Sequence, residues 1–143
     1  MKSLASFAIA VLAAWPIRET MAQSGDDTFK NTNCAKAQTQ MELNYCADKD
    51  FQVQDKKLNA LYRTVMSQQD ANGQSLLKTA QRNWLAYRDS ECGFETAGSA
   101  GGSIQPMEYS LCLSEKTKAR VKELQAQRDC AEGDLTCNAG TKQ

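Results

Sequence analysis

Six cysteines constrain this chain more than any other feature, because they occur without a CxxC pair in a sequence that has no histidine. Zinc sites use closely spaced cysteine and histidine ligands, so the pattern disfavours a bound metal. A redox-active role is the alternative, but the spacing lacks the CxxC arrangement that activates a thiolate. In an exported chain an even number of cysteines is typical of a disulfide framework. We therefore predict six structural cysteines: Cys34, Cys46, Cys92, Cys112, Cys130 and Cys137.

The N-terminus predicts export. Lys2 precedes an apolar run of 12 residues, Leu4 to Trp15, which is too short to span a bilayer as a helix. Thr20-Met21-Ala22 then offers small residues at the two positions that a signal peptidase reads. We predict a signal peptide at residues 1–22, a polar leader at 23–33, and a periplasmic or secreted mature protein without stable membrane insertion. An uncleaved membrane anchor is the alternative.

The rest of the chain predicts an all-α, mostly antiparallel three-helix bundle stapled by disulfides, spanning residues 34–128. Apolar residues recur at three- and four-residue spacings, which indicates amphipathic helices starting near Cys34, near Ser75 and near Pro106. The first is expected to end at Asp70–Gly73, with Gly73 in a left-handed cap, and the others at Glu95 and Arg128. Residues 129–143 are predicted to be a tail with a loop closed by Cys130–Cys137. The predicted inward-facing residues are Leu43, Ala47, Phe51, Leu58, Leu61, Tyr62, Val65, Leu76, Leu77, Ala80, Trp84, Leu85, Arg88, Cys92, Met107, Leu111, Leu113, Thr117, Arg120, Val121 and Leu124.

The expected antiparallel course of the helices also favours one disulfide scheme. A second helix that returns along the first brings Cys92 back towards Cys34, while Cys46 and Cys112 lie at matching depths. We therefore predict the bridges Cys34–Cys92 and Cys46–Cys112. A Cys34–Cys46 bridge would require the chain to fold back before the first helix begins.

Several polar residues occupy helix positions that could face inward. One interpretation is a binding site; the interpretation we favour is a buried network that fixes the helix register, with the arginines neutralised by Asp55 or Glu42. The predicted network consists of Asp55, Asn59, Gln81, Arg88 and Arg120.

Catalysis and nucleic-acid binding are disfavoured. Without histidine there is no His-based acid–base pair or triad, and the carboxylate pairs Glu42 with Asp55 and Asp89 with Glu91 resemble ordinary solvated helix residues. The predicted mature chain has 15 basic and 16 acidic residues, which is not the basic excess of a nucleic-acid binder. We expect no enzymatic activity and no cofactor.

Two ordered motifs resemble the LprI family of bacterial exported proteins. The first is TQMELNYCA, ending at Ala47, followed by Asp55-x-x-Leu58-Asn59-x-x-Tyr62; the second is AQRNWLAYRDSEC, ending at Cys92. The resemblance covers about residues 34–128 and implies a periplasmic or cell-surface helical domain that binds and inhibits a lysozyme or another cell-wall hydrolase. The sequence departs from the family's lipoprotein type because it lacks a lipid-attachment cysteine and adds Cys130 and Cys137. The alternative function is a periplasmic structural or interaction module that binds an envelope component without inhibiting lysozyme.

The segment 96–106 is the predicted partner-binding loop. Its Gly- and Ser-rich sequence, with Ser99, Gly101, Gly102 and Ser103, could enter a carbohydrate-binding cleft and offer hydrogen bonds to catalytic carboxylates. The alternative is a plain connector between helices. The near-zero net charge is less acidic than expected for a protein that is steered electrostatically towards a basic lysozyme.

Overall fold

A computed structural model describes residues 29–130 and residue 134, and within them the chain is all-α. The three main helices are α1 (Gln40–Gln68), α2 (Ala71–Glu95) and α3 (Gln105–Arg128). Two short 3-10 helices, η2 (Cys34–Lys36) and η3 (Ala97–Ser99), precede α1 and follow α2. The predicted fold class is confirmed. The predicted signal peptide, residues 1–22, lies outside the described residues.

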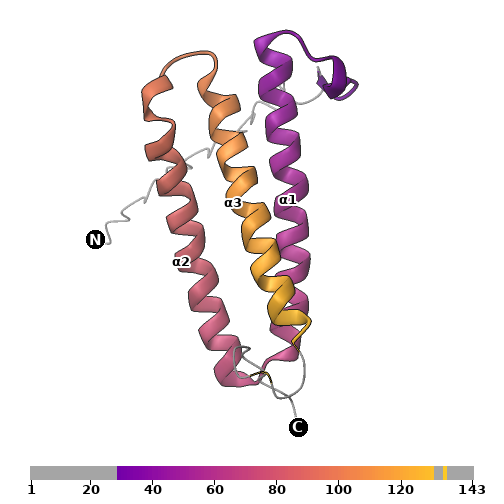
Figure 1. The fold of residues 1–143 in the computed structure, drawn as a ribbon, viewed down its shortest axis with the longest axis vertical. Helices are drawn as coiled ribbons and strands as arrows, with labels where there is room; N and C mark the ends of the chain where they lie inside the picture. The colour runs from indigo at the N-terminus through magenta and orange to yellow at the C-terminus, as the bar shows by residue number, and fades with distance from the viewer. Residues whose placement is uncertain (1–28, 131–133, 135–143) are drawn as a thin grey trace, which may run out of the picture.

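The helices form an elongated bundle in which α2 runs antiparallel to both α1 and α3 (Figure 1). The two parallel helices, α1 and α3, pack against each other more extensively than either packs against α2. One end of the bundle holds the start of α1 and the α2–α3 connection, and we call it the loop end. The opposite end holds the short connection between α1 and α2, and we call it the turn end.

The first helix begins later than the sequence predicted, at Gln40 and not near Cys34. Thr39 caps it, because its hydroxyl accepts the Glu42 N–H while the Glu42 carboxylate accepts the Thr39 N–H at 2.9 Å. This reciprocal capping box satisfies two backbone donors that would otherwise be unpaired. The backbone hydrogen bonds from Thr39 and Gln38 also hold the pKa of Glu42 below its usual value. The segment before Thr39 is therefore free to take another direction.

The disulfide pairing differs from the prediction for this reason. The bridges are Cys34–Cys46 and Cys92–Cys112, with Cα separations of 5.6 Å and 5.7 Å, so the predicted pairs Cys34–Cys92 and Cys46–Cys112 are wrong. The chain does fold back before α1 and places Cys34 beside the second turn of that helix. Cys130 is also disulfide-bonded, while its predicted partner Cys137 lies outside the described residues.

The second helix begins earlier than predicted, and Gly73 lies inside it and not in a left-handed cap. Asp70 is the N-cap, and its carboxylate accepts the Gly73 N–H at 2.7 Å. A side chain at position 73 would approach the Gln69 Oε1 atom to 2.8 Å. Close packing against Gln69 at the α1–α2 connection therefore explains why position 73 is a glycine.

A cluster of buried hydrophobic side chains lies in the turn-end half of the bundle, while Ala47, Cys92 and Leu113 are buried in the loop-end half. Leu58, Leu61 and Val65 of α1 pack with Leu124 of α3, and all four are buried. Partly buried side chains surround this cluster: Tyr62, Leu77, Trp84 and Val121. Two predicted inward-facing leucines are instead largely exposed, Leu76 at 57% and Leu111 at 45%. The loop-end half therefore depends more on its disulfides and polar contacts.

Candidate functional site

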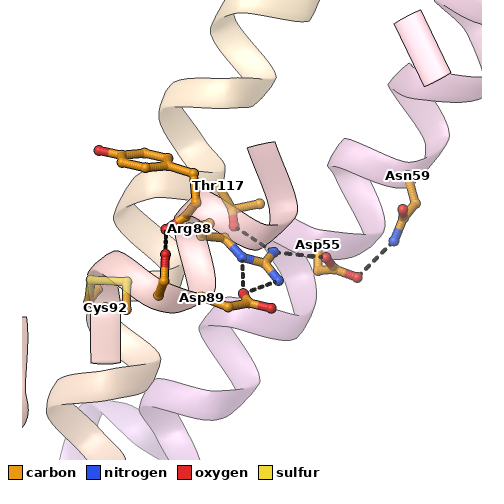
Figure 2. Close-up of polar contacts among 9 residues, drawn as sticks. Asp55, Asn59, Arg88, Asp89, Cys92 and Thr117 are labelled. Carbon is orange, nitrogen blue, oxygen red and sulfur yellow. Dashed lines mark hydrogen bonds and ion pairs between the residues drawn. A yellow bond between two sulfur atoms is a disulfide. The ribbon is translucent and has the colours of Figure 1, made fainter. Parts of the chain in front are cut away.

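The guanidinium of Arg88 occupies the middle of the bundle and joins all three helices (Figure 2). Its Nη1 atom lies 3.5 Å from Asp55 Oδ1 on α1 and 3.4 Å from the Thr117 hydroxyl on α3. Its Nε and Nη2 atoms each lie 2.8 Å from Asp89 Oδ1 on α2 itself. Only 8% of the arginine side chain is exposed. The charge is thus buried but paired, as burial of a cation requires.

Aromatic rings flank the same guanidinium. Its central carbon lies 5.2 Å from the Phe51 ring centroid and 5.3 Å from that of Trp84, which are cation–π distances. Asn59 donates to Asp55 at 2.7 Å and so fixes the carboxylate that faces the arginine. We call Asp55, Asn59, Arg88 and Thr117 the Arg88 layer.

Arg120 forms a second set of polar contacts on the turn-end side of the Arg88 layer. Its Nε donates to Gln81 Oε1 at 3.2 Å, and its Nη1 pairs with Glu123 at 2.7 Å. Trp84 links the two sets, because its ring centroid also lies 5.8 Å from the Arg120 guanidinium carbon. Glu42, the other predicted partner for the arginines, is instead engaged in the capping box.

The five predicted network residues therefore meet in two adjacent sets that cross between helices. The predicted burial holds only for Gln81 and Arg88, because Asn59 is exposed and Asp55 and Arg120 are partly buried. Their structural role stays a prediction, which these contacts support, because each arginine is paired with a carboxylate and a neutral polar partner. The only buried side-chain oxygen or nitrogen without a partner among the described residues is Gln69 Oε1, far from both sets at the turn end.

A third polar contact was missed from the sequence. The Ser114 hydroxyl, buried on α3, donates to Asp50 on α1, and Lys118 pairs with the same carboxylate at 3.0 Å. The serine hydrogen bond is the largest cause that lowers the pKa of Asp50 below its ordinary value, with Lys118 contributing in the same direction. The available signal was the run of small polar residues on the inner face of α3, where Ser110, Ser114 and Thr117 are all buried.

The predicted binding loop is a succession of tight turns. Gly101 adopts φ +78°, which favours glycine, and a Cβ at Gly102 would approach the Ser99 carbonyl oxygen to 3.0 Å. The Ser99 hydroxyl donates to the Thr96 carbonyl at 3.0 Å, so it is already engaged. Ser103 is exposed, and its side chain makes no hydrogen bond with the described residues.

The loop is also fastened on both sides. The Cys92–Cys112 bridge joins the helices that flank it, and Asn44 on α1 donates to the Ser103 carbonyl at 3.1 Å. A loop fixed in this way loses little conformational entropy when a partner binds. Of the four residues predicted to contact a partner, Gly101 and Gly102 shape the turn, while Ser103 is the one whose side chain is exposed and uncommitted.

Neither a metal cluster nor a membrane span is present in the part of the chain that the structure describes. No three histidine, cysteine, aspartate or glutamate side chains there are placed to hold a metal ion. None of the helices formed by residues 29–130 combines the length and apolar character needed to cross a bilayer.

The fold and the loop define a disulfide-stapled helical module that presents a pre-shaped loop at one end. Residues 31–124 match the family model described as "Lysozyme inhibitor LprI". The match covers most of the chain, and the protein belongs to the LprI family, as its sequence motifs indicated. The family takes its name from inhibition and not from catalysis. Together with the disulfides, membership indicates a location outside the cytoplasm.

Two relatives extend the comparison. An uncharacterized protein of Rhizobium meliloti (strain 1021) is 39% identical over 113 residues, covering 70% of this chain and 81% of that protein. The uncharacterized protein YecT of Escherichia coli (strain K12) is 27% identical over 121 residues, covering 74% of this chain and 68% of its own length. No solved structure matches this chain.

Proposed function

We propose that this protein is an exported, periplasmic or secreted, non-enzymatic inhibitor that binds a lysozyme through its α2–α3 loop. Membership of the LprI family supports the target class. The observation that carries the binding mode is the ordering of residues 96–104 by tight turns, a disulfide and Asn44. A pre-ordered loop at the end of the bundle is suited to insertion into a concave carbohydrate-binding cleft, because little entropy is lost on insertion.

Ser103 is the side chain best placed to test this mode. In the proposed complex its exposed hydroxyl donates a hydrogen bond inside the cleft, and a catalytic carboxylate of the lysozyme is a suitable acceptor. Replacement by a bulky residue blocks insertion without disturbing the helices, since only the backbone carbonyl of Ser103 is engaged by Asn44.

The test is a cell-wall lysis assay with residues 23–143 and a stoichiometric amount of lysozyme. Wild-type protein is expected to inhibit, Ser103→Trp to lose inhibition, and Ser75→Trp to retain it, because Ser75 is an exposed residue near the turn end. Failure of the disulfide-intact wild type to inhibit several lysozyme types would overturn the inhibitor function. In that case, recovery of an envelope component would support the alternative interaction module.

A further inference from the structure

Charge is segregated along the bundle, although the whole chain has 17 basic and 17 acidic residues. The Arg88 layer divides residues 29–130 into a loop-end half, residues 29–54 and 89–116, and a turn-end half, residues 56–87 and 118–130. The acidic residues of the loop-end half are Glu42, Asp48, Asp50, Asp89, Glu91, Glu95, Glu108 and Glu115, against the basic residues Lys30, Lys36, Lys49 and Lys116. The basic residues of the turn-end half are Lys56, Lys57, Arg63, Lys78, Arg82, Lys118, Arg120, Lys122 and Arg128, against the acidic residues Asp70, Glu123 and Asp129.

The zero net charge of the whole chain therefore does not describe the electrostatic potential around the α2–α3 loop. The helices run along the long axis of the bundle, so the two halves lie at opposite ends (Figure 1). Potentials from charges at the far end are screened over about 8 Å at physiological ionic strength. Asp89 and Asp50 pair with Arg88 and Lys118 at the boundary between the halves, and without these two carboxylates the loop-end half still has six acidic residues against four basic ones. A partner that approaches the loop end consequently encounters an acidic excess, which attracts a basic partner.

An apolar groove opens on this acidic half between α1 and α3. Leu43, Ala47, Met107 and Leu111 line it, together with Cys46 and Asp50. Leu111 is 45% exposed in spite of its predicted inward position. Most of the other large exposed apolar side chains also belong to the loop-end half: Met41, Val53, Phe94 and Ile104.

The groove is continuous with the proposed binding loop. Asn44, which holds the Ser103 carbonyl, directly follows Leu43 of the groove. The Gln40 side-chain nitrogen on α1 lies 3.9 Å from the sulfur of Met107, so one end of the groove reaches the first turns of α1 and α3. Glu108 precedes Leu111 by three positions on α3, and residues three apart are neighbours on a helix surface, so Glu108 borders the groove residue Leu111. It makes no ion pair with the described residues. An acidic group is thus available beside the apolar floor.

We propose that this groove is a docking surface for a basic protein, which inserts an apolar side chain between Leu43 and Leu111 and pairs a lysine or arginine with Glu108. The inference rests on the proposed function, because it gives the bound lysozyme a second contact beside the loop. The apolar contact contributes most of the binding free energy. The acidic excess of the loop-end half attracts a cationic partner and repels an acidic one.

The experiment measures the dissociation constant of residues 23–143 for an animal-type lysozyme, which is a basic protein, by calorimetry. Leu111→Ser and Glu108→Lys are each expected to weaken binding about tenfold. The matched controls are Leu76→Ser, an exposed leucine near the turn end, and Lys78→Glu, an exposed charge in the basic half. Both controls are expected to leave the dissociation constant unchanged.

A second probe leaves this protein unaltered. Acetylation of the lysozyme lysines removes their charge and is expected to weaken binding, more at low than at high ionic strength. Thermal unfolding of each variant confirms that it is folded, and the lysis assay is run in parallel.

The outcomes separate the two proposals. If the protein inhibits lysozyme and neither Leu111→Ser, Glu108→Lys nor acetylation weakens binding, the docking surface is overturned while the inhibitor function is retained. Binding that follows the expected pattern without inhibition would support the docking surface and overturn the inhibitor function. Absence of any binding would overturn both.

Discussion

Arg88 is a single buried side chain that contacts all three helices of the bundle (Figure 2). A guanidinium with 8% exposure is tolerated because Asp55, Asp89 and Thr117 supply acceptors and two aromatic rings lie at cation–π distance. Asp55 lies on α1, Asp89 on α2 and Thr117 on α3 (Figure 2). The planar fork of arginine meets them simultaneously, which a lysine ammonium does not.

We expect Arg88→Lys to lower the free energy of unfolding by about 1–3 kcal/mol, since the charge is kept while the hydrogen bonds made by the planar guanidinium are lost. Urea unfolding at neutral pH measures the change. Arg82→Lys on the same helix is the control, because Arg82 is exposed and its substitution should change stability by about 0.5 kcal/mol or less. Equal effects of the two substitutions would contradict the importance of the Arg88 layer.

Ser114 sets a pH dependence through Asp50. Because its hydroxyl, followed by Lys118, lowers the folded-state pKa of Asp50 below the ordinary 3.8, ionised Asp50 stabilises the fold above that pH. The contribution is lost as pH falls below 3.8 through the lowered pKa. We expect Ser114→Ala to be less stable than wild type at neutral pH and the difference to shrink in stronger acid. Urea unfolding at neutral pH and well below pH 3.8 measures both values.

The control for this prediction is Ser90→Ala. The Ser90 hydroxyl donates to the Tyr87 carbonyl and touches no carboxylate, so its effect should not change with pH. A Ser114→Ala difference that is constant across the same range would show that only packing was lost.

Individual contacts were predictable to different degrees. The spacing placed Asp55 and Arg88 on inward faces, and charge pairing of buried groups then favoured their contact. The Ser114–Asp50 contact joins residues 64 positions apart, and a serine on a helix is equally compatible with solvent. The burial of Ser114 depends on how closely α1 and α3 approach each other, and helical periodicity does not specify that distance.

At the scale of the elements, the number and order of the helices followed from the sequence, but the start of α1 did not. The apolar pattern extends back to Cys34, whereas the Thr39-x-x-Glu42 capping box, also visible in the sequence, starts the helix at Gln40. That difference decided the disulfide pairing, because a chain that is not helical before Thr39 can return Cys34 to Cys46.

The two described bridges should differ in their effect on stability. Replacement of both Cys92 and Cys112 by alanine is expected to cost about 3 kcal/mol or more, because the bridge closes the α2–α3 connection and Cys92 is fully buried. Replacement of Cys34 and Cys46 should cost less, since Cys34 is exposed and the capping box still starts α1. Thermal unfolding of the two double variants compares them, and the reverse order would contradict this assignment.

At the scale of the whole molecule, stabilising interactions and charge are distributed in a related way. The turn-end half contains the apolar core and most of the basic residues, whereas the loop-end half has both described disulfides, the Asp50–Ser114 contact and the acidic excess. The bridges join the segments of the loop-end half, where several apolar side chains stay exposed and do not contribute to a core. The composition of the sequence does not show this arrangement, because the opposite charges of the two halves cancel in the net charge of the chain.

Charge segregation can be measured without any partner. Residues 23–143 should be retained by both anion and cation exchangers at neutral pH and low ionic strength, since each resin contacts the end of opposite charge. The double variant Glu108→Lys, Lys78→Glu keeps the net charge but exchanges a charge between the halves. It should elute from both resins at lower salt than wild type. If the double variant elutes at the same salt concentration as the wild type, the charges of the two ends do not govern how this molecule binds a charged surface.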